Sequence, residues 1–301
     1  VKEGDMLTYE LLLDEKTGKK AAATVTVLKK DEASLLTSAT PKMKVLKEKK
    51  KERAELPKSD ASAFSDLGLD AEIVKALGFL GYSQPTPIQS QAIPAVLEGK
   101  DLVGLAQTGT GKTAAFALPL IQQLLMNPTA LKARSARAVI LSPTRELALQ
   151  IHDAFVNFGK RLPLNFTHAI GGAPIRKQMR DLSKGVDILV ATPGRLEDLV
   201  EQKGLRLDET NFLILDEADQ MLDIGFLPAV KRIISKVSKE RQTLLFSATM
   251  SKEIKKLSET YLKDPVEVSV TPKNSTVEKI EQSLMHLSKQ NKGLALQRIV
   301  S

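Results

Sequence analysis

The sequence predicts an α/β domain in which helices flank a mostly parallel β-sheet, preceded by a small β segment. Six short apolar runs, rich in β-branched residues, alternate with amphipathic stretches such as ELALQIHDAFVNFGKRL. Strands that alternate with helices need crossover connections, which build parallel sheets. The runs are mostly apolar rather than alternating, as in strands covered on both faces. The six expected strands are LVGLA (102–106), AVILS (138–142), FTHAI (166–170), DILVA (187–191), FLIL (212–215) and TLLFS (243–247).

The composition limits the class of protein. The 301 residues suffice for one large domain or two ordinary ones. No apolar run approaches the ~18 residues of a membrane span, and the start of the chain carries no secretory signal, so we expect no membrane insertion. The absence of cysteine excludes disulfides and thiolate metal sites and is typical of a cytoplasmic protein. A net charge of +8 favours a polyanionic partner.

Differences in composition divide the chain into four segments. Residues 1–40 contain LTYELLL and TVTV on either side of the turn DEKTGKK, which predicts a β-hairpin. Residues 41–63 are charged and poor in apolar residues, as in a solvated linker. Residues 64–270 carry the α/β pattern. Within residues 271–301, EKIEQSLMHL predicts one more strand and KGLALQRIV predicts the start of a helix.

The unusual residues of the sequence gather at one place in the predicted sheet. QTGTGKT follows the first apolar run, and PTREL, GG, TPGR, DEAD and AT follow the others in turn. Ligands of open parallel sheets bind at the carboxyl ends of the strands. Loop residues scattered at random would not place six clusters on one edge, so we expect a single functional surface there.

The first of these clusters predicts a nucleotide-binding P-loop. Gly109 and Gly111 let successive backbone N–H groups point at phosphate oxygens, and a helix beginning near Lys112 adds the positive end of its dipole. Lys112 suits the β- and γ-phosphates, and the Thr113 hydroxyl suits Mg²⁺. Ala106 replaces the first glycine of the usual pattern, a mild departure because this position closes the strand. The expected loop comprises Ala106, Gln107, Thr108, Gly109, Thr110, Gly111, Lys112 and Thr113.

An acidic pair at the end of FLIL completes this chemistry. Asp216 is placed to hold Mg²⁺ directly or through water. Glu217 is placed to orient and polarise an attacking water as a general base. Adjacent carboxylates alone are more often helix caps or solvated residues, but together with a P-loop they favour a magnesium-nucleotide site.

The stretch GYSQPTPIQ, residues 81–89, predicts recognition of adenine. The amide of Gln89 can pair with N7 and the N6 amine of adenine and so distinguish adenine from guanine. Phe64 is placed to stack on the base, and Gln84 is a further candidate for nucleotide contact. The expected cofactors are therefore ATP and Mg²⁺.

The remaining clusters suit the phosphate backbone of a nucleic acid. Helix N-termini, hydroxyls, glycine N–H groups and arginines together bind phosphates without regard to sequence. Thr192 and Pro193 predict a helix start with the threonine as its cap. No aromatic platform accompanies these clusters, so base stacking is not expected to dominate. The expected set is Pro143, Thr144, Arg145, Gly171, Gly172, Thr192, Pro193, Gly194 and Arg195.

Together these residues resemble the DEAD-box ATP-dependent RNA helicases. The resemblance covers residues 64–270 through GYSQPTPIQ, AQTGTGKT, PTRELA, GG, TPGR, DEAD and SAT, and alanine at position 106 is usual in that family. It implies a RecA-like P-loop domain that binds ATP and grips single-stranded RNA. It also implies that Ser247 and Thr249, bonding toward Asp219, couple the nucleotide to RNA. The stretch QTLLFSATMSKEIKKLSETYL resembles bacterial RhlE-type members in particular.

The resemblance also implies a second lobe. The family bends an RNA strand locally when two RecA-like lobes close over ATP, and the second lobe carries an HRxGR-like motif with arginine fingers. That motif is not among the 301 residues, and residues 271–301 match only a linker and the truncated start of such a lobe. We therefore expect the chain alone to bind adenine nucleotide weakly and to be nearly inactive as an ATPase and unwinding enzyme.

Three points stay open at the level of sequence. The N-terminal hairpin faintly resembles the last two strands of a cold-shock domain, a small OB-like barrel, and an unrelated hairpin is an equal alternative. A non-catalytic RNA- or protein-binding module is favoured by the missing second lobe, whereas the intact Lys112 and Glu217 favour an enzyme. A DNA-directed helicase or another P-loop NTPase is disfavoured by Gln89 and its flanking PTPI.

Overall fold

The computed structural model describes residues 7–13, 20–27, 59–270 and 291–300. The chain divides into two compact units near residue 54. In the first unit, β1 (Leu7–Leu13) and β2 (Lys20–Val27) form an antiparallel two-stranded sheet, which confirms the predicted hairpin. The relation of this hairpin to a cold-shock domain stays a prediction.

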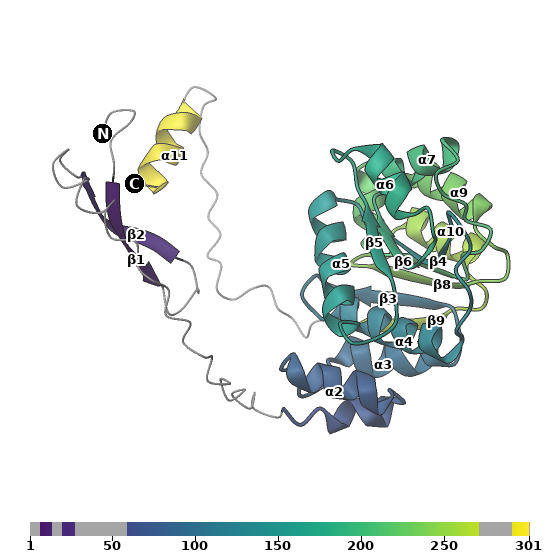
Figure 1. The fold of residues 1–301 in the computed structure, drawn as a ribbon. Helices are drawn as coiled ribbons and strands as arrows, with labels where there is room; N and C mark the ends of the chain where they lie inside the picture. Colours follow the sequence, from purple (N-terminus) through teal and green to yellow (C-terminus); the bar gives the residue numbers. More distant parts are fainter. Residues whose placement is uncertain (1–6, 14–19, 28–58, 271–290, 301) are drawn as a thin grey trace. The chain divides into compact units, whose positions relative to one another are not determined.

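The second unit is built on a seven-stranded sheet with the order β5-β6-β4-β7-β8-β3-β9 (Figure 1). Every neighbouring pair of strands is parallel. The strands are β3 (Leu102–Ala106), β4 (Ala136–Leu141), β5 (Phe166–Ala169), β6 (Val186–Ala191), β7 (Phe212–Leu215), β8 (Gln242–Ser247) and β9 (Val266–Val270). All six predicted strands are present.

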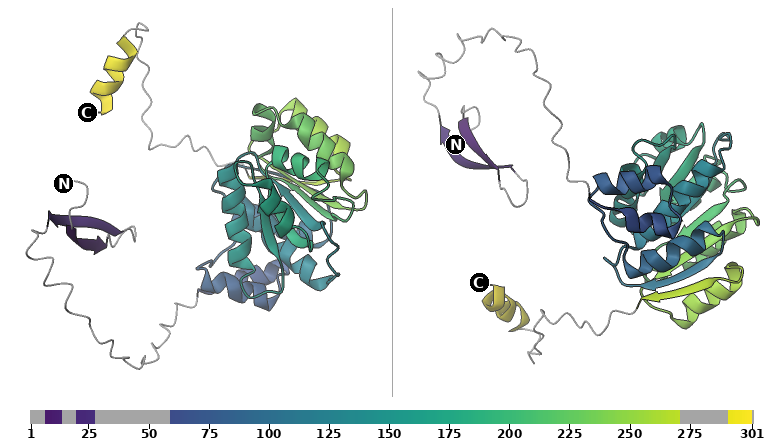
Figure 2. Two further views of the ribbon diagram at one scale, coloured as in Figure 1. Left: turned by 45° about the horizontal axis from the view of Figure 1, so that its top comes forward. Right: turned by 90° about the horizontal axis from the view of Figure 1, so that it is seen from below.

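Helices cover both faces of this sheet (Figures 1 and 2). Successive residues of β4 alternate between two hydrophobic cores: Ala138 and Ile140 belong to one, Val139 and Leu141 to the other. The inner strands are mostly apolar because both of their faces are buried. One core is covered by the 3₁₀ helix η1 (Ser62–Leu67) and by α2 (Ala71–Phe79), α3 (Pro87–Leu97), α4 (Lys112–Met126) and α5 (Arg145–Phe158). The other is covered by α6 (Ile175–Asp181), α7 (Pro193–Glu201), α8 (Ala218–Asp223), α9 (Leu227–Lys236) and α10 (Lys252–Tyr261).

The pattern of apolar runs did not predict β9. Its sequence VEVSV alternates, with Glu267 and Ser269 exposed, because β9 lies at the edge of the sheet and pairs only with β3. The predicted helix near the end of the chain is confirmed as α11 (Lys292–Val300), whereas the strand expected at 278–287 lies outside the described residues. No helix in the described part of the chain is long and apolar enough to cross a membrane.

The close packing of β3 against β8 gives a test of the fold. A Cβ atom added to Gly104 would lie 2.6 Å from the ring of Phe246 on β8, so a methyl group overpacks the core. We expect Gly104→Ala to lower the free energy of unfolding in urea by about 1–3 kcal/mol. In the control, Gly194→Ala on α7, the added methyl group meets no heavy atom within 4 Å and should be neutral or stabilising. Equal stability of Gly104→Ala and the parent chain would contradict this packing.

Candidate nucleotide and nucleic-acid site

The loops predicted to be functional meet at the carboxyl edge of the sheet. Because the strands are parallel, the residues that follow their last positions all emerge on the same side. These last positions are Ala106, Leu141, Ala169, Ala191, Leu215 and Ser247. The expectation that six separate clusters share one edge is therefore confirmed.

The P-loop connects β3 to α4 and forms as the glycine pattern predicted. Gly109 and Gly111 have φ values of 83° and 96°, a backbone region that favours glycine. The Thr110 hydroxyl donates to the Gln107 carbonyl at 2.7 Å and closes the turn. Ala106 is buried in the core, so its methyl group lies within the packing of the strand. The alanine at this position therefore does not disturb the turn formed by the two glycines and Thr110.

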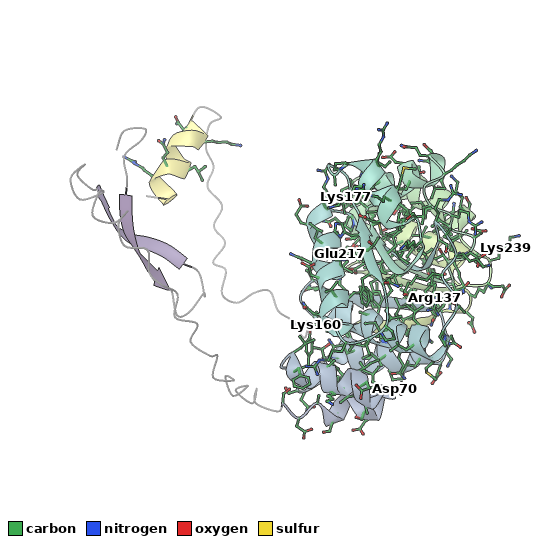
Figure 3. All side chains as sticks on the ribbon, viewed as in Figure 1. Asp70, Arg137, Lys160, Lys177, Glu217 and Lys239 are labelled. Carbon is green, nitrogen blue, oxygen red and sulfur yellow. The ribbon has the colours of Figure 1, made fainter. Side chains whose placement is uncertain are left out.

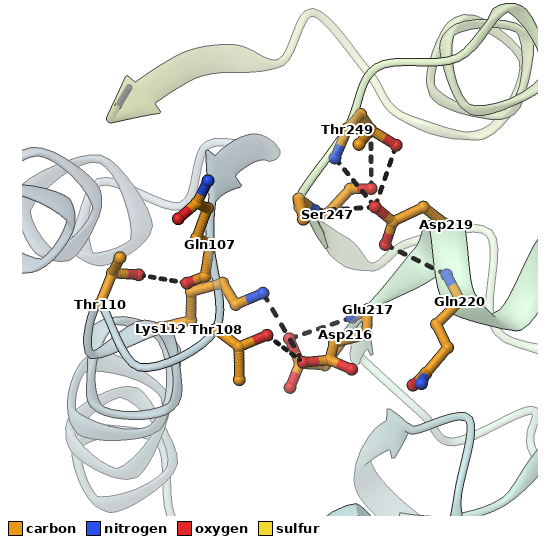
Figure 4. Close-up of polar contacts among 11 residues, drawn as sticks. Gln107, Thr108, Thr110, Lys112, Asp216, Glu217, Asp219, Gln220, Ser247 and Thr249 are labelled. Carbon is orange, nitrogen blue, oxygen red and sulfur yellow. Dashed lines mark hydrogen bonds and ion pairs between the residues drawn. The ribbon is translucent and has the colours of Figure 1, made fainter. Parts of the chain in front are cut away.

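Lys112 is the central charge of this loop. Its side chain is 6% exposed, and Nζ forms no hydrogen bond in the structure. A carboxylate oxygen of Glu217 lies 4.0 Å from Nζ (Figure 4). Burial of an ammonium group without hydrogen-bond acceptors is costly. The loop is thus built to receive further negative charge at this position.

The acidic pair faces Lys112 across the loop. Burial raises the pKa of Asp216 to about 6, Lys112 acts in the opposite direction, and the neighbouring Glu217 raises it further. Glu217 adopts a left-handed backbone conformation, φ 53° and ψ 53°, which is strained for a residue with a side chain. Its carboxylate accepts a hydrogen bond from the Thr108 hydroxyl at 3.1 Å. Both carboxylates lie beside the P-loop residues Thr108 and Lys112 (Figure 4).

The donor set fits a magnesium nucleotide better than a metal held by protein alone. The described residues contain no cluster of three or more His, Cys, Asp or Glu side chains suited to a metal ion. Mg²⁺ prefers oxygen ligands and usually takes one or two carboxylates together with phosphates and water. The Asp216 carboxylate and the Thr113 hydroxyl supply such oxygens. The unpartnered Nζ of Lys112 supplies the charge for the accompanying phosphates.

The structure gives Gln89 a different set of partners from the predicted one. Its Oε1 accepts from the Thr86 backbone N–H at 2.9 Å, and its Nε2 donates to the Gly111 carbonyl at 3.1 Å. Both ends of the amide therefore hold the P-loop against the start of α3. Pairing with adenine requires these bonds to open. Gln84, by contrast, is exposed and accessible.

Phe64 does not offer a stacking surface in this structure. The ring is fully buried in the core and packs edge-on against Tyr82, with 6.4 Å between ring centroids. The prediction that Phe64 stacks on a base is therefore corrected. Burial in the core removes more apolar area of the ring from water than a position at the solvent-facing edge would. The sequence could not distinguish these two environments.

Four of the predicted phosphate-backbone residues lie together at the edge. Thr144 caps α5 by accepting from the Leu147 N–H at 3.2 Å. Arg145 is exposed, and its guanidinium lies directly against Gly171 and Gly172, where a side chain on either glycine would crowd it. The absence of side chains on the glycine pair thus makes room for the arginine.

Arg195 turns inward instead of facing a ligand. Its Nη1 donates to the Ala173 carbonyl and to Oε1 of Gln178, both at 2.9 Å, and the side chain is 11% exposed. Thr192 precedes Pro193 at the start of α7 but makes no side-chain capping bond, which corrects the predicted cap. Gly194 has open space around it. Arg195 therefore fixes the loop that follows the glycine pair.

The predicted coupling residues meet at Asp219, with one correction. Oδ2 of Asp219 accepts from the Thr249 N–H at 2.9 Å, from the Thr249 hydroxyl at 3.0 Å and from the Ala248 N–H at 3.1 Å (Figure 4). The Ser247 hydroxyl instead donates to the Thr249 carbonyl at 2.8 Å. Ser247 therefore supports this turn without bonding to Asp219.

Two residues that the sequence did not single out belong to the same edge. The Thr86 hydroxyl is buried without a hydrogen-bond partner and lies beside Gly111 of the P-loop. Gln178 is buried, and its Nε2 donates to the Ile170 carbonyl at 3.0 Å while Oε1 accepts from Arg195. Thr86 lies inside PTPIQ and could have been found there. Gln178 carries no sequence signal, because its role depends on partners from two other segments.

The sequence pattern of the family described as DEAD/DEAH box helicase matches residues 86–257. The chain belongs to the DEAD/DEAH box helicase family. It is 45% identical over 240 residues to RNA helicase CrhR of Synechocystis sp., covering 79% of this chain and 48% of that protein. It is 46% identical over 220 residues to ATP-dependent RNA helicase CshA of Limosilactobacillus reuteri, covering 73% of this chain and 43% of that protein.

Solved structures agree with this family. A DEAD box protein from the hyperthermophile Methanococcus jannaschii matches with a TM-score of 0.63 and 36% identity, over 79% of this chain and 63% of that one. The predicted RecA-like α/β fold is thereby confirmed. This DEAD/DEAH box chain spans less than half the length of the two curated relatives. Its particular resemblance to RhlE-type members stays a prediction.

The raised pKa of Asp216 predicts how the DEAD/DEAH box domain responds to pH without nucleotide or Mg²⁺. The folded pKa of about 6 exceeds the ordinary 3.8, so the native state binds more protons between these values. Stability therefore falls as pH rises through this window and stays lower above it. We expect Asp216→Asn to raise the free energy of unfolding by about 1–3 kcal/mol near pH 7.5, and by much less near pH 4.

Urea unfolding in EDTA at both pH values measures this difference between Asp216→Asn and the parent chain. Asp187→Asn is the matched control, because Asp187 is also buried but pairs with Arg137 at 3.0 Å, and its replacement should destabilise the domain. If Asp216→Asn is no more stable than the parent chain near neutral pH, then burial of the ionised Asp216 carboxylate does not destabilise the native state as expected.

Proposed function

We propose that the α/β domain binds Mg-ATP and RNA backbone and serves as the ATP-binding lobe of an ATP-dependent RNA helicase that locally unwinds or remodels RNA duplexes. The observation that carries this proposal is the buried ammonium group of Lys112, which lacks a hydrogen bond and lies opposite two carboxylates. The oxygens of a triphosphate would supply hydrogen-bond acceptors for Lys112 Nζ, which has no partner within the described protein.

Each residue of the loop has a separate task in this proposal. Lys112 binds the β- and γ-phosphates, and the P-loop amides orient them. Thr113 and Asp216 hold Mg²⁺, which when bound neutralises the developing charge on the phosphates. Glu217 holds the attacking water and accepts its proton. Its hydrogen bond to Thr108 keeps the carboxylate near the loop before a nucleotide arrives.

The RNA-facing side of the proposal rests on Arg145 and the glycine pair. The exposed guanidinium and the open main chain at Gly171 and Gly172 suit successive phosphates. Asp219 joins the acidic motif to the turn after β8, so a change at Glu217 would reach that turn through the three hydrogen bonds that Asp219 accepts from Ala248 and Thr249. The adenine contact is assigned to Gln89 and Gln84, with Gln89 exchanging its present partners for the base.

Nucleotide binding gives the first test of the proposed function. In titrations of the 301-residue chain with a fluorescent ATP analogue, we expect Lys112→Ala to weaken binding about tenfold to hundredfold, because a charge-assisted phosphate contact is lost. The control is Lys132→Ala, an exposed lysine that pairs with Glu209 and should bind as the parent does. ATP should displace the analogue better than GTP.

The stability of Lys112→Ala shows whether weaker binding by this variant results from misfolding. Removal of an unpartnered buried ammonium group should leave the free energy of unfolding of Lys112→Ala unchanged or higher. If Lys112→Ala and the parent chain bind the ATP analogue with equal affinity, the proposed nucleotide site is wrong. Equal displacement by ATP and GTP would remove the adenine assignment alone.

Turnover gives a second test. We propose that the 301 residues by themselves hydrolyse ATP slowly, because they do not include an HRxGR-like motif, and loss of an arginine finger typically costs ~10³–10⁵ in rate. Phosphate release should stay near background with and without an RNA oligonucleotide, while a full-length relative assayed in parallel is active. RNA-stimulated turnover that Lys112→Ala abolishes would overturn this expectation. Nucleotide-independent RNA binding with no ATP binding would favour the non-catalytic module.

A further inference from the structure

An exposed apolar pair lies at the end of α2, away from the nucleotide edge. Phe79 and Leu80 are 47% and 41% exposed, whereas most large apolar side chains of the domain are buried. They border a hollow of about 270 Å³ between the last turn of α2 and the last turn of α5. Ala76, Phe158 and Leu162 complete its apolar lining. Exposed apolar side chains around a concave surface are typical of a binding site.

Positive charge surrounds this hollow. Lys75, Lys160 and Arg161 line it and are exposed, and Glu72 is the single acidic residue in the lining. Among the residues that the structure describes, these three cations form no ion pair. The Arg161 guanidinium lies over the Phe79 ring, 4.9 Å from its centroid, and so fixes the ring at the rim. The rim is therefore complementary to a negatively charged ligand.

The hollow and the predicted RNA edge lie at opposite ends of α5. Arg145 begins this helix of 14 residues and Phe158 ends it, a separation of roughly 20 Å. In Figure 3, Lys160 lies toward the α2 end of the domain and Lys177 of α6 lies toward the other end. A ligand in the hollow would leave the carboxyl edge of the sheet free.

The size and chemistry of the hollow favour a protein segment. A hollow of about 270 Å³ is large enough for one large apolar side chain. Base stacking by RNA needs an open aromatic face, and Arg161 covers one face of Phe79. A peptide needs only an apolar anchor in the hollow and carboxylates near the three cations.

We propose that the surface formed by Lys75, Phe79, Leu80, Lys160 and Arg161 docks an acidic segment of a partner protein. One large apolar side chain of that segment enters the hollow between α2 and α5. Carboxylates on either side of it pair with Lys75, Lys160 and Arg161. The apolar contact sets the register of the segment, and the ion pairs set the sign of charge that the surface accepts.

The test uses a small set of synthetic peptides, each with one Phe, Trp or Leu between pairs of Glu, titrated into the ¹⁵N-labelled chain. Saturable shifts of backbone signals are expected at the ends of α2 and α5 for at least one of these peptides. Lys160→Glu combined with Arg161→Glu should weaken that binding about tenfold or more, and Phe79→Ala should do the same. Lys236→Glu combined with Lys239→Glu, on the other face of the sheet, is the charge-matched control and should bind as the parent does.

Further arms of the experiment separate the alternatives. Peptides with Lys in place of every Glu should not shift these signals. Thermal unfolding of each variant, with a midpoint equal to that of the parent, shows that lost binding is not lost folding. The proposal is overturned if no acidic peptide gives saturable shifts at these residues up to millimolar concentration. It is also overturned if the Lys-substituted peptides bind equally well, or if a single-stranded RNA oligonucleotide shifts the same signals more strongly than any acidic peptide.

Discussion

The ammonium group of Lys112, held almost out of water with no hydrogen-bond acceptor, is the charge on which the nucleotide edge depends. Among the described residues its ion-pair partner is Glu217, whose carboxylate is 4.0 Å away and too distant for a hydrogen bond. Asp216 is so buried that its pKa rises toward neutrality. Each of these groups is poorly compensated alone. A ligand that brings phosphates and a divalent cation satisfies the lysine and the carboxylates at the same time.

The parallel sheet is what allows this arrangement to persist. Lys112 follows β3 and Asp216 follows β7, and β8 lies between these two strands. Both strands are buried on two faces, so the cores fix their ends relative to each other. The strained backbone of Glu217 is tolerated for the same reason, because the surrounding packing outweighs a cost of about 1–3 kcal/mol. The unfavourable features of the site are maintained by an apolar scaffold that contributes nothing to its chemistry directly.

The sequence predicted the scaffold and the P-loop because both depend on local signals. Continuous apolar runs mark strands with two buried faces, and the glycines at 109 and 111 mark a loop that needs left-handed backbone. It did not predict β9, since an edge strand alternates and lacks a long apolar run. It placed Arg195 on the ligand side, although the guanidinium finds a carbonyl and a glutamine behind the loop. Such side-chain partners come from segments that are distant in the sequence, so the spacing of motif residues cannot predict them.

The contacts of Phe64 and Gln89 could not be predicted for the same reason. Both residue types suit recognition of a base, but Phe64 packs in the core and Gln89 donates a hydrogen bond to Gly111. In both cases a residue of a motif makes its contacts within the protein.

Two surfaces of this domain attract negative charge, so charge alone cannot separate their ligands. At the carboxyl edge, glycine N–H groups, helix starts and Arg145 offer hydrogen-bond donors to oxygen atoms and little apolar area. At the far end of α5, the cations surround an apolar hollow in which an apolar side chain would be stabilised by burial. A phosphate backbone has no such side chain to insert, and an acidic peptide presents no regular row of phosphates. In our two proposals, shape and polarity therefore place one anionic ligand at each end of the helix, and the length of the helix would allow both to bind at the same time.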